Sequence, residues 1–81
     1  MKTEFSINLS EKKYSETYFS NLKNNPSEYF MKLRRDIISK EIKNVFIQFN
    51  QEIKLCRAAQ EKTLNVEISQ RRGYKCITFY C

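Results

Sequence analysis

The chain has 81 residues and a net charge of +6, from 15 Lys and Arg against nine Asp and Glu, and it contains no His, one Gly and one Pro. This size predicts a single domain, residues 1–81, with a core so small that a second copy of the chain is the expected source of added stability. The composition argues against a membrane span, a leader peptide and a metal site, so we expect a cytoplasmic protein without a cofactor. The excess of positive charge favours an anionic partner, most often nucleic acid.

The first predicted element is a β-strand in the stretch TEFSINL, where polar and apolar residues alternate. The alternation puts three residues on each face: Phe5, Ile7 and Leu9 on one, and Glu4, Ser6 and Asn8 on the other. No second strand pattern occurs before Thr63. We therefore expect two copies of the chain to pair their first strands across a two-fold axis, as a ribbon of the kind that fits the DNA major groove.

Two helices are predicted next. Ser10 is a candidate cap for the first helix, which would end at Asn24-Asn25. A second helix would begin with Asn25 as its cap, Pro26 at the first position and Glu28 in a capping-box contact. Its apolar residues predict one buried face: Tyr29, Phe30, Leu33, Ile37 and Ile38. Its bases lie mainly outside that face, either solvated or in contact with phosphate: Lys32, Arg34 and Arg35.

The apolar pattern continues beyond this second helix. It allows one long helix from 27 to about 61 or a break near residues 39–43, and we favour a third helix over 41–61. Alternation resumes at Thr63, and Gly73 fits a three- to five-residue hairpin turn before YKCITFYC. The predicted fold class is α+β, in the order strand, helix, helix, helix, hairpin.

Nothing in the sequence indicates an enzyme. With no His, one Asp and no Gly-rich loop, the usual acid–base and phosphate-binding groups are missing. Three cysteines without metal-type spacing are expected to be small buried hydrophobes: Cys56, Cys76 and Cys81. The tyrosines are expected mainly in the core, although bases stack on such rings: Tyr14, Tyr18, Tyr29, Tyr74 and Tyr80.

Two stretches resemble the ribbon-helix-helix repressors of the Arc/CopG type. The stretch TEFSINLSEKK is similar to the family's alternating strand and the start of its first helix, and NNPSEYFMKLRRDII is similar to the turn and second helix. The resemblance covers residues 2–40. It implies a homodimeric ribbon-helix-helix core and a regulator that represses transcription by binding double-stranded DNA. Residues 41–81 lie outside the resemblance, as a helix and hairpin extension that is a candidate for a second oligomerisation surface, for binding a protein partner or for covering the helical core. The short chain, poor in Gly and Pro and rich in Lys, Asn and Ile, suggests a plasmid, a phage or an AT-rich bacterium as its source.

The resemblance also implies roles for individual residues. Three outward strand residues fall where the family contacts bases: Glu4, Ser6 and Asn8. Six residues are the candidates for phosphate contacts: Lys2, Asn25, Ser27, Lys32, Arg34 and Arg35. The dimer core would be built from the apolar set: Phe5, Ile7, Leu9, Tyr29, Phe30, Leu33 and Ile37. Arg71 and Arg72, at the hairpin tip, are either plain exposed bases or contacts to flanking phosphate.

A second hypothesis belongs to another class: a small plasmid- or phage-encoded inhibitor or antitoxin that binds a protein through residues 41–81. In that case the first strand would pair within its own chain. Strand pairing separates the two hypotheses, because a first strand beside residues 64–68 or 75–80 of the same chain removes the basis for the repressor.

Overall fold

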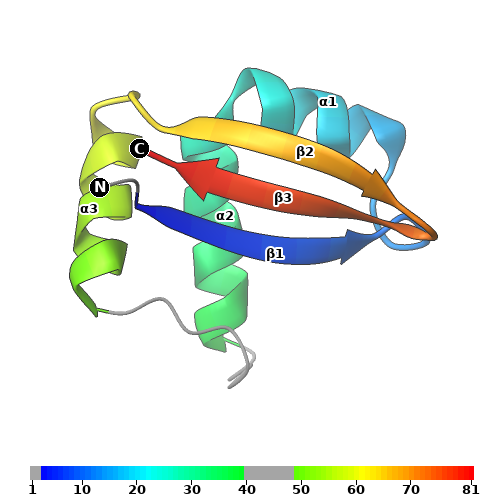
Figure 1. The fold of residues 1–81 in the computed structure, drawn as a ribbon, viewed down its shortest axis with the longest axis horizontal. Helices are drawn as coiled ribbons and strands as arrows, with labels where there is room; N and C mark the ends of the chain where they lie inside the picture. Colours follow the sequence, from blue (N-terminus) through cyan, green and yellow to red (C-terminus); the bar gives the residue numbers. More distant parts are fainter. Residues whose placement is uncertain (1–2, 40–48) are drawn as a thin grey trace.

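The computed structural model describes residues 3–39 and 49–81, except for the side chains of residues 37–39 and 49. Its elements follow one another along the chain as shown in Figure 1: β1 (Glu4–Ser10), α1 (Glu16–Asn24), α2 (Pro26–Ser39), α3 (Phe49–Gln60), β2 (Asn65–Arg71) and β3 (Tyr74–Tyr80). The predicted α+β class is confirmed, with three helices and a three-stranded antiparallel sheet in the described residues.

The sheet has the order β1-β3-β2, so the last strand of the chain lies in the middle (Figure 1). β1 pairs with β3 along its whole length, from Glu4 opposite Tyr80 to Ser10 opposite Tyr74. The expectation that β1 finds its partner only in a second copy is therefore wrong. The two-stranded ribbon assumed a strand with no neighbour in its own chain, whereas β3 is that neighbour.

The side chains explain why β1 and β3 fit together. Both strands alternate in the same phase, so their apolar residues meet on one face: Phe5 is opposite Phe79, and Ile7 is opposite Ile77. Val66 and Ile68 of β2 meet the same two β3 residues from the other side. Phe79 and Ile77 are fully buried. Their burial stabilises the pairing of β3 with β1 and with β2, because each flanking strand adds apolar contacts around the same two side chains.

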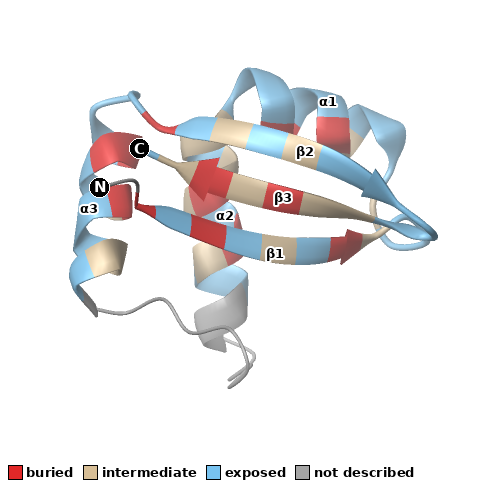
Figure 2. Cartoon of the chain, viewed as in Figure 1, coloured by how far each residue is buried: buried red, intermediate tan, exposed pale blue. Residues whose placement is uncertain are grey.

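The helices cover this apolar face. In Figure 1, α2 passes behind the sheet, and Figure 2 shows the buried residues in red on its strands and helices. The core gathers buried residues from the three helices, β1 and β3, and Val66 and Ile68 of β2 pack against it. Four residues of the predicted dimer core are buried inside the single chain: Phe5, Leu9, Phe30 and Leu33. Ile7 and Tyr29 pack against them while partly exposed. The seventh, Ile37, has its side chain outside the described residues.

The predicted helix starts are right in one case and wrong in another. α1 is capped by Ser15, whose side chain accepts a hydrogen bond from the Tyr18 N–H. Ser10 instead ends β1, and its hydroxyl accepts from the Lys12 N–H in the following turn. Ser10 pairs with Tyr74 in the sheet, so its backbone is held extended and the helix starts later. Pro26 opens α2 as predicted.

The details around α2, α3 and the hairpin differ slightly from expectation. Glu28 forms an ion pair with Lys32, and the Asn25 side chain donates to the Asn21 carbonyl, in place of a capping box. α3 begins at Phe49, while residues 41–48 of the predicted helix lie outside the described residues.

The predicted hairpin is confirmed, with Gly73 at a φ of 81°. Its loop has two residues rather than three to five, because pairing continues to the ends of both strands.

The cysteines differ in burial. All three are free thiols: Cys56 is half-buried and packs against the core, Cys76 is half-buried, and Cys81 is exposed. The prediction that they are small buried hydrophobes is therefore met in part at Cys56 and is wrong for Cys76 and Cys81. Cys76 is on the face of β3 opposite the buried Ile77, since neighbouring strand residues point to opposite sides.

Within residues 3–39 and 49–81, no helix has the length and apolar character needed to cross a bilayer.

Phe79→Ala should lower the free energy of unfolding by about 3–5 kcal/mol, because it leaves a cavity where β3 meets Phe30 and the flanking strands. Ser69→Ala, an exposed β2 position, is the matched control and should change it by less than about 0.5 kcal/mol. Urea unfolding followed by circular dichroism measures both. Equal effects would contradict the central position of β3.

Candidate interaction surface

One face of the sheet is not covered by any described helix, and we call it the open face. The strand registers place twelve outward residues on it: Glu4, Ser6, Asn8 and Ser10 from β1, Tyr74, Cys76, Thr78 and Tyr80 from β3, and Asn65, Glu67, Ser69 and Arg71 from β2. Eight of these twelve residues belong to the C-terminal hairpin, β2 and β3. The side chains of the open face are small, polar or tyrosine, and they include two carboxylates and one guanidinium.

The three residues predicted to contact bases are on the open face, and all three are exposed: Glu4, Ser6 and Asn8. Their outward direction is as predicted. The Ser6 hydroxyl is hydrogen-bonded to the Thr78 hydroxyl across the strands at 2.8 Å. These residues therefore form the edge of a wider three-stranded surface. The charged members, Glu4, Glu67 and Arg71, do not give that surface an excess of positive charge.

The described residues among those predicted to contact phosphate lie elsewhere. Asn25 is between α1 and α2, and Ser27 is in the first turn of α2. Arg34 is half-buried in an ion pair with Glu52 of α3, so its guanidinium is already engaged. Lys32 pairs with Glu28, Arg35 is exposed, and Lys2 lies outside the described residues. Because α2 packs behind the sheet (Figure 1), Ser27, Lys32, Arg34 and Arg35 do not share a surface with Ser6 and Asn8.

Three tyrosine rings form an aromatic cluster at α1 and α2. Tyr18 lies between Tyr14, at 4.7 Å, and Tyr29, at 5.1 Å between ring centroids. Burial, and then the proximity of Tyr14, Tyr29 and Asp36, raises the pKa of Tyr18 to about 12. Its hydroxyl is therefore neutral throughout the physiological pH range. All three rings pack against the core, as predicted for tyrosines at helical spacing. Tyr74, by contrast, is exposed on β3.

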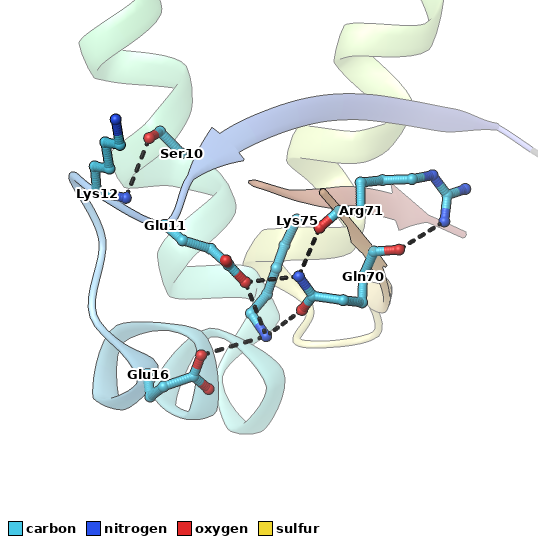
Figure 3. A network of polar contacts seen from close by, with 7 residues as sticks. All are labelled: Ser10, Glu11, Lys12, Glu16, Gln70, Arg71 and Lys75. Carbon is cyan, nitrogen blue, oxygen red and sulfur yellow. Dashed lines mark hydrogen bonds and ion pairs between the residues drawn. The ribbon is translucent and has the colours of Figure 1, made fainter. Parts of the chain in front are cut away.

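A polar network fastens the segment after β1 to the hairpin (Figure 3). Lys75 is at its centre, with a side chain only 15% exposed. Its ammonium donates to the Gln70 side-chain oxygen at 2.9 Å and lies 3.5 Å from Glu16 and 3.9 Å from Glu11. The Gln70 amide in turn donates to Glu11 at 2.7 Å. The inward-pointing Lys75 is thus balanced by two carboxylates, which this buried position requires.

The same end of the molecule gathers four exposed bases, which we call the basic end: Lys12, Lys13, Arg71 and Arg72. Two backbone contacts bring the two pairs together. Ser10 is opposite Tyr74 in the sheet, and the Glu11 N–H donates to the Gly73 carbonyl at 3.2 Å. The sequence indicated only Arg71 and Arg72 as a candidate pair of bases. It did not indicate that Lys12 and Lys13 lie near them, because this proximity depends on β1 pairing with β3.

In the described ranges, no group of three His, Cys, Asp or Glu side chains is arranged to hold a metal ion. None of the protein-family models, curated proteins or solved structures compared with this chain matches it. The likeness to ribbon-helix-helix proteins therefore depends only on two short stretches, TEFSINLSEKK and NNPSEYFMKLRRDII.

Lys75→Met should lower the free energy of unfolding by about 1–2 kcal/mol, because it removes charge-assisted contacts from a mostly buried position. Glu16→Gln is the control. Its carboxylate is 81% exposed, and its pair with Lys75 should contribute less than about 0.5 kcal/mol. Both values come from urea unfolding at low ionic strength. A larger effect at Glu16 than at Lys75 would show that the network is not organised around Lys75.

Proposed function

We propose that the chain is a protein-binding module that acts through the open face of its sheet. The observation that carries this proposal is the pairing of β1 with β3 inside the chain. That pairing was the condition separating a protein-binding inhibitor or antitoxin from a ribbon repressor. It also joins β1 to the hairpin in one continuous surface.

The composition of the open face supports a protein partner. Tyrosine provides rigid contact area with little loss of side-chain entropy, and Ser, Thr and Asn provide adaptable hydrogen bonds. The open face has this composition, with Tyr74 and Tyr80 on its central strand and small polar residues on both sides. Nucleic acid would instead favour an excess of positive charge, and the carboxylates of Glu4 and Glu67 oppose that.

Most of the open face belongs to residues 41–81, the segment that the second hypothesis expects to bind a protein. β2 and β3 supply eight of its twelve residues. Behind it, Phe30 of α2 packs against Phe5 of β1 and Phe79 of β3, so the surface is presented on a packed support. Such a support lowers the entropy lost on binding.

The sequence-specific DNA-binding homodimer is less well supported as a hypothesis. It requires a β1 ribbon between two copies, whereas β1 is bonded to β3. Its base contacts and phosphate contacts would also have to come from one surface, but Ser6 and Asn8 lie on the open face and Lys32 and Arg35 lie on α2. A repressor would need another geometry.

Asn8→Glu and Ser69→Glu test the proposal, since these residues flank Cys76 in the middle of the open face. Each places an unpaired carboxylate in the expected interface and should weaken binding by about 2 kcal/mol or more, roughly thirtyfold. The control, Gln60→Glu, puts the same charge at an exposed position on α3. Partners retained by each tagged variant in source cells are compared by quantitative mass spectrometry, and the purified partner is then titrated by calorimetry.

The expected partner is retained by the unchanged chain and by Gln60→Glu but is lost by both open-face variants, which remain folded. A partner retained equally by all variants would place the interface elsewhere.

A further inference from the structure

The basic end differs from the open face in both charge and position. Lys12 and Lys13 follow β1, and Arg71 and Arg72 are at the hairpin tip, so residues far apart in the sequence meet at one end of the sheet. Arg71 also belongs to the edge of the open face. Both carboxylates nearby, Glu11 and Glu16, lie against Lys75 (Figure 3).

This arrangement leaves the four bases without neutralising partners. Ion pairs in the described residues involve Lys32, Arg34 and Lys75, and none of the four bases at this end takes part in one. Lys75 offsets one of the two carboxylates, so this end of the molecule keeps an excess of positive charge: five bases (Lys12, Lys13, Arg71, Arg72 and Lys75) against two acids (Glu11 and Glu16). Such an excess in a small area attracts a multiply charged anion.

The placement of the four bases favours a polyanion over a small anion. Lys12 and Lys13 follow β1, whereas Arg71 is on β2 and Arg72 is in the loop between β2 and β3, so the four bases come from both sides of the central strand. A chain of phosphates offers one anionic group to each base in turn, whereas a single phosphate or carboxylate offers one group to all four. Arginine also binds phosphate through two parallel hydrogen bonds, which favours phosphate at the hairpin tip.

An aromatic ring lies between the two pairs. Tyr74 is on the central strand, opposite Ser10 on one side and Arg71 on the other, and it is 36% exposed. A tyrosine ring beside cations is the arrangement on which an unpaired base stacks while its backbone is held. A duplex does not offer an unpaired base face, and an acidic protein surface does not offer a regular array of bases.

We propose that the basic end, together with Tyr74, binds single-stranded nucleic acid through its phosphates and one stacked base. This goes beyond the proposed protein-binding function and does not depend on it. The two surfaces share only the edge that contains Tyr74 and Arg71, so a nucleic acid at the basic end leaves the middle of the open face accessible.

Fluorescence anisotropy with a labelled single-stranded oligonucleotide tests the proposal over a range of salt concentrations. If all four bases contact phosphate, log K should fall with log salt at a slope of about −3, from roughly 0.7 per contact. Arg71→Gln with Arg72→Gln should flatten that slope by about 1.4, and so should Lys12→Gln with Lys13→Gln. The control, Lys23→Gln with Lys54→Gln, removes two exposed charges from α1 and α3 and should leave the slope unchanged.

Tyr74→Leu separates stacking from charge. It should weaken binding by about 5- to 150-fold, the range of one lost base stack, without changing the salt slope. Duplex of the same sequence and poly-L-glutamate are the comparison probes, and both should bind more weakly than the single strand.

Three results would overturn the proposal. One is a control pair that weakens binding as much as either pair at the basic end. Another is tight binding of poly-L-glutamate with weak binding of the oligonucleotide, which would identify an acidic protein surface as the partner. The third is a preference for duplex that Tyr74→Leu does not change. Circular dichroism of each variant shows that the fold is kept.

Discussion

The fold depends on β3 receiving a strand on each of its edges. β1 comes from one end of the chain and β2 from the other side of the hairpin, and among the described strands each is paired with β3 alone. The fully buried Phe79 and Ile77 take part in both pairings, and Phe79 contacts the helix layer through Phe30. A hairpin alone is marginally stable in water, so β1 and the helices complete a unit that β2 and β3 do not form by themselves.

The elements could be predicted from the sequence because each depends on local physics. Alternation in TEFSINL indicated a strand, Pro26 fits the first position of a helix, and Gly73 has the positive φ that its turn requires. Ser10 and Ser15 show the limit of such rules. Both are good helix caps, and only the pairing of Ser10 with Tyr74 decides that Ser15 is used.

The strand partner could not be predicted in the same way. Alternation in β1 shows which residues face the core, but it is the same whether the core lies in a second copy or in the same chain. Glu4, Ser6 and Asn8 were therefore correctly expected to face outward, while their neighbours were misidentified. The basic end could not be predicted from the sequence for the same reason. Lys12 and Arg71 become neighbours only when β1 and β2 are placed on either side of β3.

The pairing of β1 with β3 inside one chain is tested most directly by nuclear Overhauser contacts in two samples. In uniformly labelled protein, the structure predicts contacts between Phe5 and Phe79 and between Ile7 and Ile77. In an equal mixture of labelled and unlabelled chains, a filtered experiment that detects only contacts between chains should lack both. Two results would contradict the pairing inside one chain. One is the appearance of these contacts in the mixed sample. The other is a contact in the mixed sample between Ile7 of one chain and Ile7 of another, together with the loss of the Phe5–Phe79 contact in the uniformly labelled sample, because β1 would then take its partner from a second copy.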